Sequence, residues 1–371
     1  MGLSLALALA RQGLRVGLIG ARPGPAPAPA GVGADAVGDV RAYALNAASR
    51  QLLTDLKVWD ALPPDAVTPV DDMHVAGDAP GGAIDFSAWR QGCEALAWIV
   101  DAAALEAALH TAARFAPHLA WVADDSPEAQ PCALTVLAEG RDSATRQALG
   151  VRYERHAYGH TALAARLVAT EPHLGLARQW FRSPDVLALL PFDRPKPGRS
   201  YGLVWSLPTA RAQALLAAPV AEFEAALAEA TGGAAGLGGL SLASERAAWP
   251  LAVAQADRLC GAGWVLVGDA AHLVHPLAGQ GLNLGLADVA ALARVISQKE
   301  PWRALGDEIL LRRYARERAL PTRAMALVTD GLLHLFAQPQ PLLRELRNRG
   351  LTLLNHLTPI KRFLTQRALD A

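Results

Sequence analysis

Cysteine is scarce in this chain. Its 371 residues include three cysteines, Cys93, Cys132 and Cys260, which are widely spaced and form no CxxC pair. Structural zinc sites and disulfide frameworks both need clustered cysteines, so neither is expected and no metal site is predicted. Scattered free thiols are typical of a reducing compartment, so the sequence predicts a cytoplasmic protein.

An excess of charge of one sign is also missing. Lys+Arg and Asp+Glu both number 35, which gives a formal net charge of +0. Proteins that bind nucleic acid generally carry a basic surplus that neutralises phosphates. No nucleic-acid partner is therefore expected.

Long uncharged apolar runs are absent as well. No such run reaches the roughly 18 residues that a membrane-spanning helix needs, so no span is predicted. The apolar start "MGLSLALALA" has no basic residue before it and Arg11 after it, which argues against a secretory signal. Hydrophobic residues make up 52% and charged residues 19%, as in a globular enzyme. The length indicates one large domain or two interleaved domains.

The most informative stretch is "VLVGDAAHLVHPLAGQGLNLG" at 265–285. "WVLVGD" has the length and β-branched content of a buried parallel strand, which places Asp269 at the carboxyl end, where open α/β sheets bind ligands. From Gly281 the apolar spacing becomes helical, with one face listed as Leu282, Leu286, Val289, Leu292 and Ile296. Three glycines in the turn and first helical turn let the backbone approach a ligand, and free N–H groups face it. The stretch predicts a cofactor cradle.

Two histidines lie inside this stretch, His272 and His275. They could act as metal ligands or as bases, but their spacing without further ligands does not suit a closed zinc site. A structural or solvent-gating role is favoured.

The N-terminal residues predict an amphipathic helix over 2–13 and a buried strand over 14–20. A helix followed by a strand is the second half of a βαβ unit. If Gly2 is the last glycine of a dinucleotide-binding GxGxxG, the preceding strand and two glycines are expected before Met1, in roughly 10–20 further residues.

Other segments fill in an α/β pattern. Short strands are predicted within 66–100 and 133–140, a sheet between 161 and 207, and helices over 101–115 and from 219 to 231. Asp101 is the expected N-cap of the first of these helices. The tail from 301 is expected to be helical.

"GDAAHLVHPLAGQGLNLGLAD" resembles the second flavin-binding motif of the para-hydroxybenzoate-hydroxylase-like monooxygenases. "DVRAYALNAASRQLL", "LALLPF", "ERAAWPL" and "TDGLLHLF" narrow the resemblance to the ubiquinone-biosynthesis FAD-dependent hydroxylase family. The resemblance spans nearly the whole chain. It implies a Rossmann-like FAD-binding domain without its first strand, interleaved with a substrate domain on a mixed or antiparallel sheet, plus C-terminal helices. The implied boundaries are 1–65, 95–150 and 255–300 for the FAD domain, 66–94 and 151–254 for the substrate domain, and 301–371 for the helical region.

The resemblance also implies roles for single residues. Asp269, after Gly268, would bind the ribityl chain of FAD, and Arg41 would contact its pyrophosphate. The isoalloxazine would be lined by Pro276 and by the backbone of Gly279, Gln280, Gly281, Leu282 and Asn283. "AEGRDSATR" (138–146) matches a fingerprint that serves FAD and the nicotinamide, in which Glu139 and Gly140 replace the usual Asp-Gly pair. Gly20 stands where the family usually has a ribose-binding Glu.

The implied activity is hydroxylation of a polyprenylated phenol or quinol, with FAD as cofactor, NADH or NADPH as reductant and O2 as co-substrate. Because the cofactor carries the chemistry, no separate catalytic acid or base is assigned. Two alternatives stay open: a flavin-poor structural partner in a quinone-biosynthesis complex, and a monooxygenase of another apolar substrate. The basic, apolar tail within 342–369 suits either peripheral contact with the inner face of the cytoplasmic membrane or packing on the protein's own core.

Overall fold

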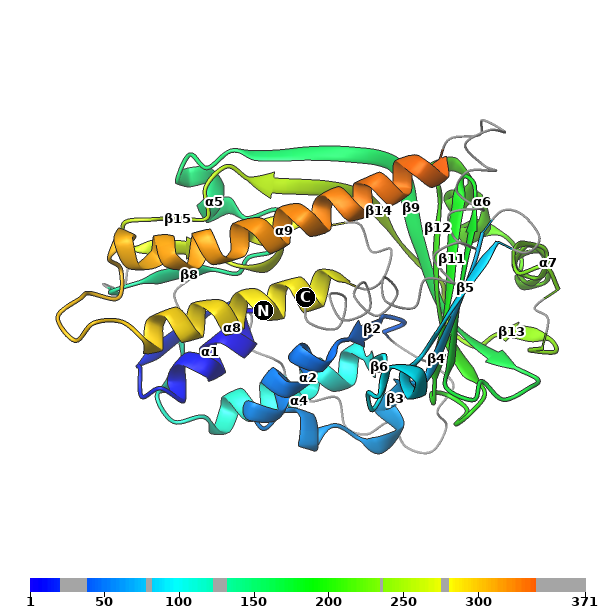
Figure 1. The fold of residues 1–371 in the computed structure, drawn as a ribbon, viewed down its shortest axis with the longest axis horizontal. Coiled ribbons are helices and arrows are strands. Elements are labelled where there is room, and N and C mark those ends of the chain that lie inside the picture. Colours follow the sequence, from blue (N-terminus) through cyan, green and yellow to red (C-terminus); the bar gives the residue numbers. More distant parts are fainter. Residues whose placement is uncertain (21–38, 78–81, 123–131, 234–235, 275–279, 338–371) are drawn as a thin grey trace.

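The computed structural model describes residues 1–20, 39–77, 82–122, 132–233, 236–274 and 280–337. Figure 1 shows a large sheet seen nearly edge-on, with a layer of helices and smaller sheets on one side and two short helices on the other. The predicted mixed α/β fold is confirmed.

The large sheet contains nine strands and is mostly antiparallel. Its order is β17-β14-β9-β12-β11-β10-β4-β5, and β13 also pairs with β9. Among the described strands of this sheet, β10 and β4 are the one parallel pair. The strands are β4 (Asp72–Ala76), β5 (Ala83–Ser87), β9 (Tyr153–Ala169), β10 (Leu176–Arg182), β11 (Asp185–Phe192), β12 (Ser200–Pro208), β13 (Leu240–Leu242), β14 (Ala247–Ala256) and β17 (His272–Leu273).

Both faces of this sheet are covered near its centre. In β9, every residue from 161 to 167 is buried, whereas most of 153–160 is exposed. Helices α6 (Thr209–Ala217) and α7 (Val220–Ala230) pack on one face through a core that includes Trp205 and Phe223. On the other face, Phe192 packs with Val70 and Ile99 from the smaller sheet β2-β6-β3. Central strands therefore read as continuous apolar runs rather than alternating ones.

The remaining strands form three small sheets. The first joins β2 (Ala42–Leu45), β6 (Ala97–Asp101) and β3 (Val67–Val70). The second joins β15 (Cys260–Gly261), β16 (Trp264–Leu266) and β8 (Thr135–Leu137), and the third pairs β1 (Val16–Ile19) with β7 (Leu119–Val122). The pairs β16–β8 and β1–β7 are parallel, as expected for a dinucleotide-binding layer.

Helices cover these small sheets and build the main core. They are α1 (Gly2–Ala10), α2 (Ala47–Asp55), α4 (Ala102–Phe115), α8 (Gln280–Ser297) and α9 (Glu308–Ala337); short α3 (Ala88–Gln91) and α5 (Ala144–Ala148) lie elsewhere. Asp101 caps α4 by accepting the Ala104 N–H, as predicted. The predicted face of α8 is confirmed, since Leu286, Val289 and Leu292 belong to the main core.

Two predictions for the N-terminal segment are wrong. Every residue of α1 from 4 to 10 is buried, so this helix is not amphipathic. It lies beside α4 and α8, which cover it on more than one side (Figure 1). The β1 strand is not buried, because it lies in a two-stranded sheet and alternates between partly buried and exposed residues.

Two further points concern the other end of the chain. Helix α9 begins within the region predicted to be helical, while residues 338–371, on which the membrane expectation depends, lie outside the described residues. Among the described helices, none combines the length and apolar character that crossing a membrane requires.

Candidate cofactor site

The predicted cradle begins where β16 ends. After Leu266 the chain makes a single 3-10 turn, Gly268–Ala270, and the φ of Gly268 is +61°, a conformation that favours glycine. The Gly268 N–H donates to Oδ2 of Asp288 at 2.9 Å. Asp269 therefore stands at the carboxyl end of a parallel strand, as the sequence predicted.

The Asp269 carboxylate is half-buried and has no hydrogen-bond donor among the described residues. Burial raises its pKa, and the charges of His272 and Arg141 oppose that rise without cancelling it. An acid held in this state is costly unless something donates to it. The site is thus prepared for a ligand that carries hydroxyl or other N–H or O–H donors.

The backbone around Asp269 is fixed by two side chains, one from α5 and one from the first residue of β9. The Tyr153 hydroxyl donates to the Asp269 carbonyl at 2.7 Å. Arg146 is buried, donates to the Ala270 carbonyl at 3.0 Å, and lies 3.7 Å from the centre of the Tyr153 ring. These contacts hold the turn, so the Asp269 side chain is free to serve a ligand.

Behind the turn lies a buried charge cluster. His272 Nε2 is 2.7 Å from Asp288 Oδ2, and Arg318 Nε donates to Asp288 Oδ1 at 2.7 Å. Burial raises the pKa of Asp288, but the His272 and Arg318 contacts outweigh it, so the net pKa lies below its ordinary value. The structural interpretation of His272 fits this position; His275 lies outside the described residues.

The N-terminus of α8 meets the β2–α2 connection. Asn283 accepts the Asn46 N–H through Oδ1 at 3.0 Å and donates from Nδ2 to the Ala44 carbonyl at 2.8 Å. Asn46 in turn caps α2. Since the Asn283 side chain is fully engaged in this contact, only its backbone is left to face a cofactor. Leu282 packs on the main core, and at Gly281 an added Cβ would meet open space.

Arg41 lies just before β2. Its guanidinium pairs with Asp39 at 2.7 Å and Glu106 at 3.1 Å, and its side chain is 39% exposed, so an anionic ligand could still reach it. Burial raises the pKa of the neighbouring Tyr43, and nearby carboxylates that include Asp269 add to the rise. The Arg41 segment and the Asp269 turn therefore lie within electrostatic reach of each other.

Glu139 follows β8 and has a local partner set. Its carboxylate accepts the Ser143 hydroxyl at 2.6 Å and both the N–H and hydroxyl of Thr145, at 3.1 Å and 2.5 Å. Burial opposes these bonds, yet they lower the pKa of Glu139 overall. Gly140 follows with a φ of +78°, which lets the chain turn into α5. In this structure Glu139 organises the α5 entrance.

The other predicted positions are placed as follows. Gly2 begins α1, where an added Cβ would lie 3.5 Å from the Ala138 Cβ. Gln280 begins α8, and its side chain is not described. Pro276 and Gly279 lie outside the described residues. Apart from Arg41, which lies just before β2, the described members stand at the ends of β8 and β16 and at the starts of α1 and α8.

Sequence reasoning missed four supporting residues: Arg146, Tyr153, Asp288 and Arg318. Asp288 closes the glycine-rich stretch and Arg146 closes the 138–146 fingerprint, so both were in view without a role. Their common signal is an ionisable residue at a buried position, which needs a partner. Tyr153 and Arg318 offered no signal, because their partners lie 116 and 30 residues away.

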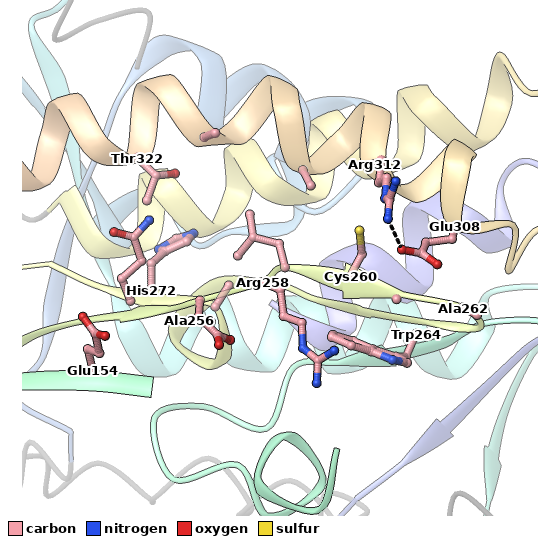
Figure 2. A pocket seen from close by; sticks show the side chains of 17 residues that line it. Glu154, Ala256, Arg258, Cys260, Ala262, Trp264, His272, Glu308, Arg312 and Thr322 are labelled. Carbon is pink, nitrogen blue, oxygen red and sulfur yellow. Dashed lines mark hydrogen bonds and ion pairs between the residues drawn. The ribbon is translucent and has the colours of Figure 1, made fainter. Parts of the chain in front are cut away.

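A separate cleft of about 790 Å³ lies between α9 and the strands β14 to β17. Figure 2 shows the side chains of Arg312 and Thr322 extending from α9 toward this ribbon, with Glu308 paired to Arg312. Ala271 and His272 also line the cleft. It therefore touches the Gly268–Ala270 turn from behind and adjoins the buried Asp288 cluster.

Comparison with known proteins identifies the family. The FAD binding domain family matches residues 94–329. The ubiquinone hydroxylase UbiL of Rhodospirillum rubrum is 30% identical over 387 residues, covering 100% of this chain and 87% of that protein. The 3-demethoxyubiquinol 3-hydroxylase of Escherichia coli is 30% identical over 385 residues, covering 98% and 94%.

Solved structures agree on the fold. Pseudomonas aeruginosa pqsL, a probable FAD-dependent monooxygenase, superposes with a TM-score of 0.71 at 19% identity over 94% of this chain and 95% of that one. Klebsiella pneumoniae HpxO complexed with FAD and uric acid gives 0.65 at 19% identity over 95% and 90%. The chain therefore belongs to the FAD-dependent flavoprotein monooxygenases, in the family of ubiquinone-biosynthesis hydroxylases.

Proposed function

We propose that this protein uses FAD, NADH or NADPH, and O2 to hydroxylate a polyprenylated phenol or quinol ring in ubiquinone biosynthesis. The names of its relatives support the substrate class, since UbiL is a ubiquinone hydroxylase and the Escherichia coli relative acts on a demethoxyubiquinol. The observation that carries the proposal is the Asp269 carboxylate, which is half-buried at the carboxyl end of β16 and has no donor in the part of the chain that the structure describes.

This carboxylate fits FAD because the ribityl chain presents hydroxyl groups that can donate to it. FAD, when bound, supplies the redox and oxygen chemistry, and the protein supplies binding and orientation. The first turn of α8 would offer backbone N–H groups to the flavin ring from Gln280, Gly281, Leu282 and Asn283. Pro276 and Gly279, which lie outside the described residues, keep their predicted role beside the ring. The Asn283 side chain keeps that turn against β2 through Ala44 and Asn46.

The other assigned positions serve the rest of the cofactor. Arg41 would pair with the diphosphate, for which it must exchange part of its contact with Asp39 or Glu106. Gly2, at the start of α1, would allow close packing beside β8. Glu139 and Gly140 would act mainly by shaping the α5 entrance, at the edge where FAD and the nicotinamide are expected.

We also propose the following domain boundaries. Residues 1–65, 95–150 and 255–300 form the FAD-binding domain, and residues 66–94 and 151–254 form the substrate-binding domain. The nine-stranded sheet supplies most of the substrate-binding domain. Its face toward the layer of helices and small sheets, here called the cofactor layer, is apolar and suits an apolar ring. Residues 301–371 form the helical region.

A direct experiment combines flavin spectra with product analysis. Purified protein should show flavin absorbance and should oxidise NADH or NADPH in the presence of a polyprenylated phenol. Mass spectrometry of quinones, in a strain that lacks its own ring hydroxylases, should show the hydroxylated intermediate only when the intact gene is supplied. Protein that is colourless and fails to bind added FAD would instead favour a non-catalytic partner in a quinone-biosynthesis complex.

The apolar substrate suggests where the enzyme works. We propose that it contacts the inner face of the cytoplasmic membrane peripherally through the basic and apolar residues of 342–369, or works within an assembly that delivers the substrate. Truncation after Arg349 should abolish binding to anionic liposomes and leave flavin content unchanged. Loss of folded protein on that truncation would show that the tail packs on the core instead.

A further inference from the structure

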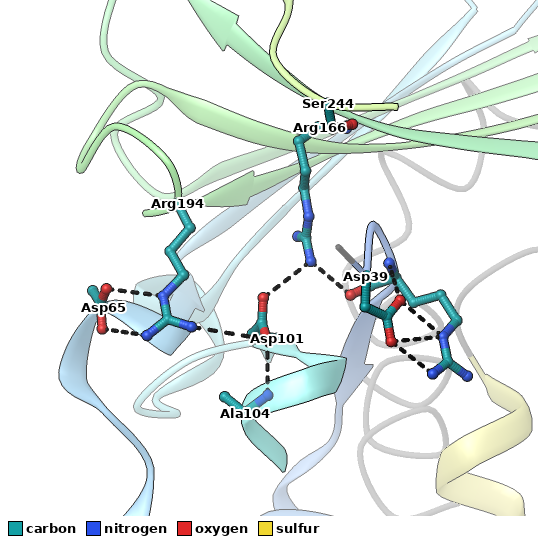
Figure 3. A network of polar contacts seen from close by, with 8 residues as sticks. Asp39, Asp65, Asp101, Ala104, Arg166, Arg194 and Ser244 are labelled. Atoms are coloured by element: carbon teal, nitrogen blue, oxygen red, sulfur yellow. Dashed lines mark hydrogen bonds and ion pairs between the residues drawn. The ribbon is translucent and has the colours of Figure 1, made fainter. Parts of the chain in front are cut away.

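Arg166 is a fully buried cation in the middle of the large sheet. It lies on β9, in the run of buried residues from 161 to 167, and its side chain is 0% exposed. Figure 3 shows that the side chain leaves the sheet and points into the cofactor layer. There Nη2 donates to the Arg41 carbonyl at 2.6 Å and to Asp101 Oδ2 at 3.2 Å.

Burying the charged guanidinium of Arg166 in these surroundings has a large desolvation cost. Its guanidinium lies 4.0 Å from the centre of the Phe192 ring, and neither Nε nor Nη1 has a partner among the described residues. Burial lowers the pKa of Arg166 to about 10, and the charge of Asp101 opposes that fall, so the side chain stays charged at neutral pH. Replacing a buried ion pair by apolar residues is often neutral or stabilising. Stability alone therefore does not explain an arginine here.

The two acceptors of the Arg166 hydrogen bonds indicate a role for this side chain. The Arg41 carbonyl is the last main-chain group before β2, and it also accepts the Ala102 N–H at 3.3 Å. Asp101 caps α4 through Oδ1, with its other oxygen on Arg166. One nitrogen of Arg166 thus ties the large sheet to the start of β2 and to the start of α4.

Residues 39–41 also fix the direction of the Arg41 guanidinium. Asp39 accepts from both the backbone N–H and Nε of Arg41, so main chain and side chain are held as one unit. A shift of the Arg41 carbonyl would move the guanidinium that faces the cofactor. A displacement of this kind is enough to weaken a charge-assisted contact, whose strength depends on geometry.

We propose that Arg166 is a positioning residue for the cofactor: it couples the substrate-side sheet to binding of the FAD diphosphate by fixing the main chain of Arg41. The inference rests on the proposed assignment of Arg41 to that diphosphate. It also links the large sheet directly to the segment that carries Arg41.

The test is a double-mutant cycle on FAD affinity, measured by quenching of flavin fluorescence in apoprotein titrations. Arg166→Met should weaken FAD binding by about tenfold. In an Arg41→Ala background the same change should alter the affinity by less than about twofold, because the residue through which Arg166 acts is gone. Multiplicative effects of the two substitutions would overturn the inference.

A matched control separates this role from general damage. Arg194 belongs to the same network (Figure 3), with Asp65 at 2.8 Å and Asp101 at 3.8 Å, and none of its contacts in the described part of the chain is with Arg41. Arg194→Met should leave FAD affinity within about twofold of the wild type. An equal loss in Arg166→Met and Arg194→Met would overturn the inference, since it would indicate a loosened domain contact.

The salt dependence of binding gives a second readout. If Arg41 no longer meets the diphosphate in Arg166→Met, the fall of FAD affinity with ionic strength should shrink to that of Arg41→Ala. A salt dependence that stays at the wild-type level would contradict the proposal. Should Arg166→Met fail to fold, Arg166→Lys, which keeps the charge but ends one bond short of the Nη2 position, is put through the same cycle and judged by the same outcomes.

The cofactor inference and the proposed activity can fail separately. Absence of ring hydroxylation with an intact coupling between Arg166 and Arg41 would reject the substrate proposal alone. Hydroxylation with independent effects of the two residues would reject the role of Arg166 alone. Wild-type FAD affinity in Arg41→Ala would reject the Arg41 assignment and the role of Arg166 together.

Discussion

His272 Nε2 lies 2.7 Å from Asp288 Oδ2, and this buried pair supports the turn that presents Asp269. The same oxygen of Asp288 accepts the Gly268 N–H, while its other oxygen accepts from Arg318 on α9. A single carboxylate thus joins the cofactor turn, α8 and α9. The glycine-rich stretch ends on Asp288 for a structural reason.

Asp288→Asn should be strongly destabilising, because it removes the buried negative charge and replaces one of the two acceptor oxygens, which serve His272 and Arg318, by an NH2 donor. Breaking a buried charge pair typically costs about 3–5 kcal/mol, and urea unfolding of the apoprotein would measure this loss. Asp257→Asn is the matched control, since its pair with Arg152 is near the surface and should contribute under about 1 kcal/mol. Equal losses for the two variants would contradict this account.

Asp288 also predicts a pH dependence. Its folded pKa lies below the unfolded value of about 4, so its contribution to stability is complete above that value. The contribution should be lost as the pH falls below about 4 and through the folded pKa. Unfolding free energies measured across this window should fall less steeply in Asp288→Asn than in the wild type. Parallel curves would show that Asp288 does not titrate as described.

Tyr153→Phe removes one hydrogen bond and little else. The hydroxyl holds the Asp269 carbonyl at 2.7 Å, while the ring would still stack on Arg146. Loss of such a bond costs about 0.5–1.5 kcal/mol, so FAD affinity should fall by roughly two- to tenfold with a small change in stability. Isothermal titration of the apoprotein with FAD tests this. Unaltered affinity would mean that the turn does not need the tyrosine.

Glu139→Ala should act on the fold more than on FAD. The carboxylate accepts three hydrogen bonds from Ser143 and Thr145, so its loss should cost about 1–3 kcal/mol of unfolding free energy. FAD affinity should change by less than about threefold, because the Glu139 carboxylate is already engaged by Ser143 and Thr145. If Glu139→Ala were as stable as the wild type but lost much of its affinity for FAD or the nicotinamide, Glu139 would have a direct binding role.

The sequence predicted the parts of this site that are local in the chain. The end of β16, the glycine turn and the helical face of α8 are each contained in one short stretch, and the Asp101 cap needs only three residues. Long-range partners were out of reach. In the sequence, Arg166 is a single charged residue in an apolar strand. Nothing nearby in the sequence indicates that it donates hydrogen bonds to Arg41 and Asp101. Burial of α1 and exposure of β1 likewise depend on neighbours brought together by the fold.

In the apoprotein, the buried charge of Asp269 should lower the free energy of unfolding. Burial raises its pKa, so the folded protein holds the proton more tightly and its stability falls as the pH rises from about 4 through the folded pKa. Asp269→Asn removes this charge, and the apoprotein variant should be at least as stable as the wild type at neutral pH, with a flatter pH profile. A marked loss of stability would show that the carboxylate has a structural partner.

The affinity of the same variant for FAD tests the central claim most directly. A charge-assisted hydrogen bond to the ribityl hydroxyls contributes about 1.5–3 kcal/mol, so the Kd for FAD should rise by roughly 10- to 150-fold in Asp269→Asn. The effect should persist at pH 7 and diminish as the wild-type carboxylate becomes protonated at lower pH. If Asp269→Asn binds FAD as tightly as the wild type at pH 7, Asp269 is not the residue that holds the cofactor.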